Sequence, residues 1–114
     1  VIGHGPHVLR AAEWRGDALV LYSLGNLLTN GPFSVAEPNG RGAVACAEIA
    51  PTGRVEGGRI HSTRQVRPGA LIADPEARAA WLIDSLGRLD FPSSGVRMGR
   101  DGEMTVPRSP RRTP

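Results

Sequence analysis

Two strand-like runs separated by a short link constrain this chain more than any other feature of its sequence. The first run reads HVLRAAEW and ends at Trp14, and the second, ALVLYSL, begins at Ala18. The link Arg15-Gly16-Asp17 suits a tight turn, so the pattern predicts an antiparallel hairpin. The second run is almost wholly apolar, which indicates a strand covered on both faces.

The middle of the chain predicts more sheet, interrupted by one long loop. Thr29–Gly42 has the composition of a loop, and loops of this length in compact domains are often functional or disordered. The strand pattern returns over Ala43–Ala50. After a turn at residues 51–54, Val55–Val66 predicts one or two strand segments with a bulge or turn at Gly57-Gly58.

A helix is predicted next, with its start and end marked by sequence signals. Asp74 is a good N-cap, Pro75 fits the first helical position and Glu76 favours the positive end of the helix dipole. Phe91-Pro92 ends the helix. The apolar face is expected to consist of Trp81, Leu82, Leu86 and Leu89. Trp81 is expected to anchor the helix on the sheet, and Trp14 is likewise expected to be a packing group.

The predicted fold class is therefore α/β of the α+β type, mostly strands with one terminal helix. Residues 96–106 allow a terminal strand around an Asp101-Gly102 turn, and residues 107–114 predict a disordered, basic, proline-rich tail. The chain begins at Val1 with residues typical of the end of a strand, so we expect it to be the C-terminal piece of a longer protein.

The charged residues argue against a nucleic-acid partner. All 14 basic residues are arginine, which is typical of a GC-rich and plausibly bacterial coding bias, and the net charge is only +3. These arginines are spread along the chain, and aromatic residues are scarce, whereas a nucleic-acid surface needs clustered charge and often stacking groups. We expect no nucleic-acid binding and at most a weak attraction for anions.

Neither the cysteine nor the apolar residues predict a site of their own. Cys46 is the single cysteine, which excludes an intrachain disulfide and a cysteine-based zinc site in this chain. It is expected to be a small buried thiol in a strand. No apolar run approaches the roughly 20 residues that span a bilayer.

The segment GHGPH near the start is the candidate site. Imidazole is the commonest protein ligand for borderline divalent metals, and His4 and His7 at the mouth of a strand can face one ion. Glycine at positions 3 and 5 lets the backbone turn, and Pro6 stiffens the turn. A hydrogen-bonded structural pair explains the same spacing, so both interpretations stay open at this point.

Two motifs in order carry a resemblance to a known family. Gly3, His4, Pro6 and His7, followed by the acidic Glu13 and then by Tyr22-Ser23-Leu24-Gly25-Asn26, resemble the CapA family of bacterial capsule and poly-γ-glutamate synthesis proteins. The later segment ADPEARAAWLIDSLGRLDF resembles the terminal helix of that family, so the likeness covers residues 1 to about 95. Gly5, Arg10 and Leu27 depart from the residues frequent in the family.

The resemblance implies a fold and a chemistry. The family is similar to the calcineurin-like metallophosphatases, which implies that residues 1–95 are the C-terminal half of an αββα sandwich. It also implies divalent metal ions of the Mn, Fe, Zn or Mg class held by His4 and His7, and hydrolysis of an anionic or phosphorylated substrate. The remaining ligands are expected upstream of Val1, so this piece alone is expected to be inactive.

Other residues keep two interpretations each. Asn26 is either a substrate-binding or ligand-orienting amide at the metal rim or part of a turn, and Ser23 is either its neighbour at that rim or a structural residue. Glu13 either orients a histidine or pairs with an arginine, or it is a solvated charge of the hairpin. His61 is expected on a sheet face.

Two other functional classes compete with a metal-dependent hydrolase. One is a non-catalytic scaffolding or binding component of a polymer synthesis and export complex, with other capsule or polyglutamate synthesis proteins as partners. The other is an unrelated small β domain with a basic tail. Whether the whole protein is an enzyme stays open at this stage, and a membrane-associated or extracytoplasmic location is implied by the resemblance alone.

Overall fold

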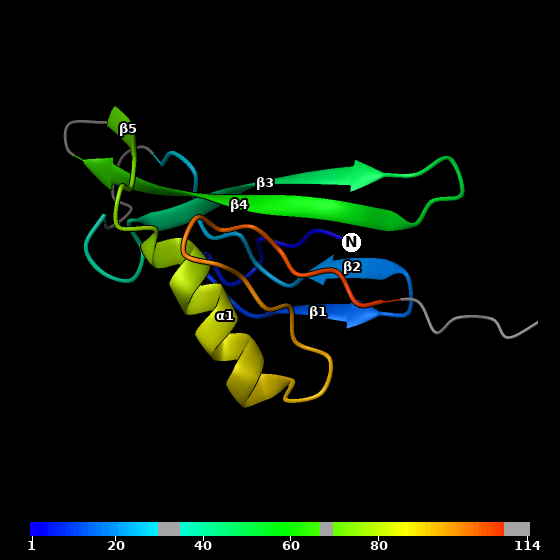
Figure 1. Ribbon diagram of the computed structural model, residues 1–114. Helices are drawn as coiled ribbons and strands as arrows, with labels where there is room; N and C mark the ends of the chain where they lie inside the picture. The colour runs from blue at the N-terminus through cyan, green and yellow to red at the C-terminus, as the bar shows by residue number, and fades with distance from the viewer. Residues whose placement is uncertain (30–34, 67–69, 109–114) are drawn as a thin grey trace, which may run out of the picture.

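The computed structural model describes residues 1–29, 35–66 and 70–108, and over these residues the chain has a mixed α+β fold, as predicted. Its helix lies against strands that surround a single core (Figure 1). The elements are β1 (Ala12–Arg15), β2 (Ala18–Leu21), β3 (Arg41–Ile49), β4 (Val55–Val66), β5 (Ala70–Ala73) and α1 (Arg78–Asp90). Residues 30–34 of the predicted loop and residues 109–114 of the predicted tail lie outside the described residues.

The predicted hairpin is confirmed by β1 and β2. Ala12 pairs with Leu21 and Arg15 with Ala18, so the two strands are antiparallel around the Gly16-Asp17 turn. Gly16 has a φ of 62°, a left-handed conformation that glycine adopts without strain. Leu21 is buried while Ala18 is exposed, so the cover over β2 is less complete than its apolar sequence predicts.

The second sheet has the predicted bulge directly beside Gly57-Gly58, but it lacks the alternative, a second turn. β4 runs through both glycines as one strand, so no second turn forms. Glu48 pairs with Gly57 and Ile49 with Val55, which leaves Glu56 as the extra residue of a bulge in β4. Gly58 has a packing role, because a Cβ atom there would lie 3.1 Å from the Met104 sulfur and 2.9 Å from the carbonyl oxygen of Cys46. β5, which the sequence did not reveal, pairs with the last residues of β4.

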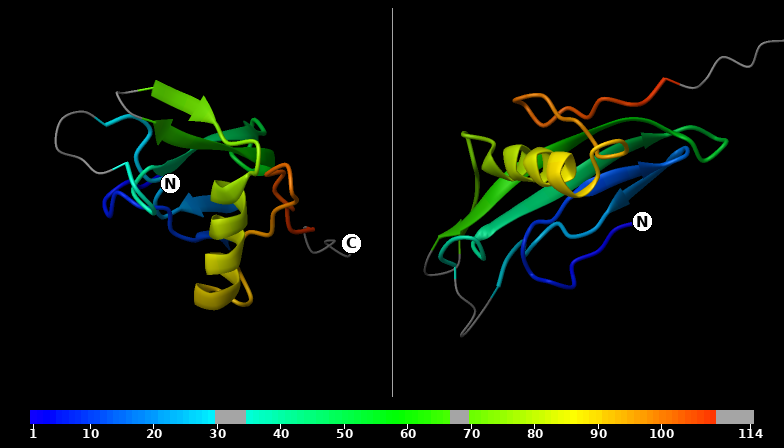
Figure 2. Two further views of the ribbon diagram at one scale, coloured as in Figure 1. Left: turned by 90° about the vertical axis from the view of Figure 1, so that its left-hand side faces the viewer. Right: turned by 90° about the horizontal axis from the view of Figure 1, so that it is seen from below.

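Backbone pairings join the two sheets into a closed circuit around the core. The left view of Figure 2 shows the larger sheet above the β1–β2 hairpin, with the segment after the helix beside them. In order, the pairs are β3 with β4, Arg59 with Glu103, Met104 with Met98, Gly95 with Glu13, β1 with β2, and Gly25 with Gly42. The side chains enclosed include Trp14, Leu21, Ile60, Val96 and Met104. The segment after the helix therefore closes the fold, through isolated bridges on both sides of the turn at Gly99–Gly102.

The helix begins three residues later than predicted, at Arg78 instead of Pro75. Ala77 has a φ of 52°, which belongs to the left-handed region and prevents the helix from starting earlier. The N-cap residue is therefore Ala77 and not the predicted Asp74, although the Asp74 carboxylate accepts hydrogen bonds from the backbone N–H groups of Glu76 and Arg78. Ser62 on β4 likewise accepts the N–H of Ala80.

The predicted apolar face of the helix is wrong at Trp81 and Leu89, whereas Leu82 packs against the core as expected. Trp81 and Leu89 are 67% and 76% exposed, and Leu82 and Leu86 are half-buried. The buried residues are instead Ala79, Ala80, Ile83 and Gly87. The small residues among them bring the helix backbone close to the segment that follows the helix and contains Gly95 (the closing segment). At Gly95, for example, a Cβ atom would lie 2.6 Å from the Gly87 carbonyl oxygen.

The end of the helix agrees with its prediction. The helix stops at Asp90, and the N–H of Phe91 donates to the carbonyl of Gly87. Its 13 residues are too few for a bilayer crossing, and the described residues contain no other helix.

Candidate functional site

The two histidines of GHGPH lie in one tight turn at the surface. The N–H of His7 donates to the carbonyl oxygen of His4 at 3.0 Å, with Gly5 and Pro6 between them. His7 has a φ of 60°, a left-handed conformation that is uncommon for a residue with a side chain. Such conformations are concentrated at functional sites, where surrounding contacts hold them in place.

The turn that follows β2 holds both imidazole rings. The Nδ1 atom of His7 lies 2.9 Å from Oδ1 of Asn26, and Nδ1 of His4 lies 3.3 Å from the carbonyl oxygen of Gly25. Both partners are carbonyl oxygens, which only accept, so each neutral ring carries its proton on Nδ1. This tautomer places the lone pair, through which imidazole binds metals, on Nε2.

The strand end that positions the rings is itself fixed by backbone contacts. Leu24 donates to Gly3 and accepts from Ala43, so it is held between the N-terminal segment and β3. Ser23 is 1% exposed, and its hydroxyl accepts the N–H of Gly25. Ser23 therefore shapes the turn that presents Asn26, which is 9% exposed.

Glu13 is buried, so its interpretation as a solvated charge of the hairpin is wrong. It is 3% exposed, and its carboxylate accepts hydrogen bonds from the hydroxyls of Tyr22 at 2.6 Å and Ser94 at 2.7 Å. An Arg15 guanidinium nitrogen lies 3.7 Å from the same carboxylate. These contacts involve no histidine, so the interpretation in which Glu13 orients one gains no support.

The hydrogen bonds at Glu13 perturb two titratable groups. The Tyr22 hydroxyl, then the Ser94 hydroxyl and the nearby Arg15 charge, hold the pKa of Glu13 below its ordinary value, against the opposing effect of desolvation. The same bond to Glu13, with desolvation second, raises the pKa of Tyr22 above its ordinary value. Each shift favours the ionised carboxylate beside the neutral phenol.

Tyr22 also links this cluster to the end of the helix. Its ring stacks on Phe91 with centroids 5.3 Å apart, while Arg10 forms an exposed ion pair with Asp90 at 3.4 Å. Sequence reasoning missed Tyr22 and Ser94 as partners of Glu13. The hairpin register was the available signal for Tyr22, because Glu13 pairs with Val20 and a residue two positions further lies diagonally on the same face. Ser94 is 81 residues away and had no local signal.

The histidine turn fits a divalent metal only in part. Each ring has the carbonyl partner on Nδ1 that metal-ligating histidines commonly have. Across residues 1–29, 35–66 and 70–108, however, no group of three or more His, Cys, Asp or Glu side chains is placed to hold an ion. Among these residues, therefore, no third side chain of this kind joins the two imidazoles.

The histidine turn and the β2 strand end also carry the match to known proteins. Residues 1–31 match the family model of the bacterial capsule synthesis protein PGA_cap. The resemblance to the capsule synthesis family is therefore confirmed over the segment that contains His4, His7 and Asn26. No curated protein matches the sequence.

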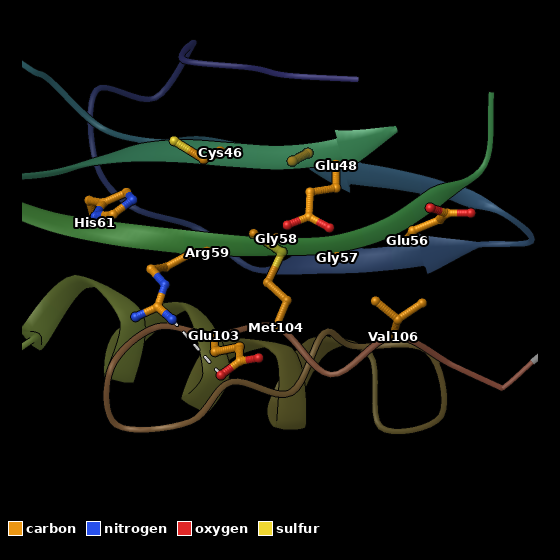
Figure 3. Close-up of a pocket in the computed structure, with 11 residues that line it drawn as sticks. Cys46, Glu48, Glu56, Gly57, Gly58, Arg59, His61, Glu103, Met104 and Val106 are labelled. Atoms are coloured by element: carbon orange, nitrogen blue, oxygen red, sulfur yellow. Dashed lines mark ion pairs between the residues drawn. The ribbon is translucent and has the colours of Figure 1, made fainter. Parts of the chain in front are cut away.

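A surface pocket lies away from the histidine turn, against β3, β4 and the segment around Met104 (Figure 3). Its volume is about 610 Å³, and Cys46 and His61 lie on its rim. Cys46 is exposed, so the prediction of a buried thiol is wrong, whereas His61 lies on a sheet face as predicted. Arg59 in this pocket is neutralised by Asp101 and Glu103, at 3.1 and 3.9 Å, which leaves no unbalanced positive charge for a ligand there.

Proposed function

We propose that this chain belongs to a CapA-like protein of capsule or poly-γ-glutamate biosynthesis, which acts as a metal-dependent hydrolase of the phosphoesterase type. His4 and His7 are its metal ligands, and Asn26 orients His7. The observation that supports the proposal is the pair of Nδ1 contacts with consecutive residues, Gly25 and Asn26, at 3.3 and 2.9 Å.

The proposed ligands are held before any metal binds. The carbonyl partners keep the proton on Nδ1, and the turn closed by His7 and His4 limits the motion of both side chains. Preorganisation of this kind raises metal affinity, and loss of an outer-shell partner typically lowers affinity or activity about 10–100-fold. Asn26 is therefore a positioning residue in this proposal.

The metal would belong to the Mn, Fe, Zn or Mg class, with the nitrogen ligands favouring the first three. When bound, such an ion polarises a phosphoryl oxygen and lowers the pKa of a coordinated water. The residues of this chain hold the ion at an exposed rim, which an anionic or phosphorylated substrate can reach from solvent. A membrane-associated or extracytoplasmic location belongs to the same proposal.

Metal content tests this proposal. We would express the protein from its complete gene, purify it without added chelator and measure bound metal by elemental analysis. We expect at least one divalent ion per chain, its loss in the His4→Ala/His7→Ala double variant and weaker retention in Asn26→Ala. His61→Ala removes an exposed histidine elsewhere and should change nothing. Equal metal content in the double variant and the wild type would contradict the proposal.

A non-catalytic scaffolding role is the second candidate, and one observation favours it. The described residues contain no group of three or more metal-ligating side chains. In that case the histidine turn is a structural connection between the N-terminal segment and β2, and the partners are other capsule or polyglutamate synthesis proteins. A metal-free wild-type protein that folds normally and co-purifies with such proteins would favour this role.

A further inference from the structure

A groove at the start of the helix exposes the larger part of a tryptophan. It lies between α1 and the turn at Gly99–Gly102 and has a volume of about 460 Å³. Trp81 lines it and is 67% exposed, with Pro75 and Met98 adding apolar surface. Tryptophan is enriched at binding interfaces, where it combines a large apolar ring with a polar N–H group.

The two walls of the groove are tied together. A carboxylate oxygen of Asp84 on α1 accepts the N–H of Met98 at 2.9 Å, which holds the start of the second wall against the helix. The N–H of Gly102 donates to the carbonyl of Gly99, so Arg100 lies at a central position of a closed turn. Helix and turn lie side by side in Figure 1. The groove is therefore formed before a ligand arrives, which reduces the entropy that binding must overcome.

The charges around the groove leave one cation unpaired. Glu76 forms an ion pair with Arg78, and Asp84 forms one with Arg88 at 2.8 Å. Arg100 is exposed and has no ion-pair partner among residues 1–29, 35–66 and 70–108. A guanidinium group in this position can bind a carboxylate through two parallel hydrogen bonds.

We propose that this groove binds a carboxylated sugar ring, such as a uronic acid residue of an acidic glycan. Trp81 stacks on the C–H face of the ring, and Arg100 pairs with its carboxylate. The carboxylates of Glu76 and Asp84 accept hydrogen bonds from ring hydroxyls at the edges of the groove. Donors and acceptors on either side of a flat apolar platform match a hydroxyl-rich ring better than a lipid chain or an apolar helix.

This inference concerns a surface separate from the histidine turn and does not depend on the proposed metal chemistry. A ligand of one to three rings on a shallow groove should bind with a Kd on the order of 1 mM or somewhat below. Arg100 should confer preference for the acidic sugar, while Trp81 should contribute to binding of any sugar ring.

Calorimetric or NMR titration of the complete protein with tri-galacturonate tests the assignment, beside the neutral maltotriose. We expect tri-galacturonate to bind about tenfold more tightly than maltotriose, Trp81→Ala to weaken it at least tenfold, and Arg100→Gln to abolish the preference. Leu89→Ala, which removes the other exposed apolar side chain of α1, is the matched control and should bind as the wild type. A thermal melt of each variant confirms that it is folded.

Three results would each overturn the inference. One is the absence of tri-galacturonate binding up to about 10 mM, ten times the expected Kd. Another is unchanged binding by Trp81→Ala. The third is equal or tighter binding of tri-glutamate, an acidic peptide of the same charge, which would assign the groove to peptides instead of sugars.

Discussion

The same N-terminal 26 residues build two polar clusters with opposite characters. The histidine turn is exposed, and its contacts join residues that belong to two recognisable motifs, GHGPH and YSLGN. Glu13 itself is buried, and its contacts reach the partly exposed Tyr22 after β2 and Ser94 beyond the helix. The histidine turn is the site of our proposed function, whereas the contacts of Glu13 connect the two ends of the fold.

The comparison shows that a charged residue in a family-like pattern need not belong to the site. Glu13 lies within the matched segment, but its two hydroxyl partners and Arg15 account for its charge. A buried carboxylate is tolerated only when it is hydrogen-bonded and compensated, so these partners are needed for folding. The histidines, which are exposed, need no such compensation.

The largest expected effect is loss of stability when the Glu13 cluster is cut. Glu13→Ala leaves two hydroxyls without their shared acceptor and should destabilise the protein more than any other change proposed here. Ser94→Ala removes one hydrogen bond to a charged group and should lower the free energy of unfolding by about 1.5–3 kcal/mol. Urea unfolding measures both. Ser93→Ala is the adjacent exposed control, and equal effects of the two serine variants would break the comparison.

The pH dependence of stability should come next in size. Because the pKa of Glu13 is lowered in the folded state, its contribution is fully present above the ordinary value of 4.5 and is lost as pH falls through the folded pKa. Because the pKa of Tyr22 is raised, its contribution is present below 10.0 and is lost as pH rises through the folded pKa. Glu13→Gln should therefore flatten melting temperature against pH at both extremes.

Asp101 is the control for the acid limb of that profile. The backbone N–H of Glu103 and the nearby Arg59 charge lower its pKa, against the opposing effect of desolvation, so it contributes acid sensitivity of the same sign. Asp101→Asn should change the acid limb and leave the alkaline limb alone. An alkaline limb that is the same in Glu13→Gln and wild type would show that the Tyr22 bond does not form in solution.

Substitutions in the histidine turn should have little effect on stability and a large effect on metal content. His4→Ala and His7→Ala should each change the free energy of unfolding by less than about 1 kcal/mol, because both side chains are exposed. The same variants should lose metal in the experiment described above. A large loss of stability without a loss of metal would make the turn structural and would remove the contrast between the two clusters.

The smallest effect is expected at the exposed ion pair beside the turn. Arg10 and Asp90 have side chains 47% and 40% exposed, so Arg10→Ala should lower the free energy of unfolding by only about 0.5 kcal/mol. This difference should shrink when the ionic strength is raised to 1 M, where charges are screened within about 3 Å. A loss comparable to that of Ser94→Ala would mean that Arg10 packs on the protein as well as pairing with Asp90.

The errors in the predicted fold share one cause, which is contact between distant segments. Trp81 and Leu89 were assigned to the core from their hydrophobicity, yet the helix buries alanine, isoleucine and glycine because the closing segment at Gly95 approaches its backbone. The bulge expected at Gly57-Gly58 forms one residue earlier, at Glu56, whereas Gly58 is packed against Met104. Neither the position of Met104 nor that of Gly95 can be deduced from local pattern.

The sequence by itself determined the hairpin, the α+β class, the end of the helix and the family resemblance over the opening segment, because each depends on local pattern. Tertiary structure alone decided the closed circuit of pairings, the buried face of α1, the exposure of Cys46 and the role of Glu13. Glu13 shows the reason most directly. Whether a carboxylate is solvated or buried depends on residues as distant as Ser94, which only the folded backbone brings to it.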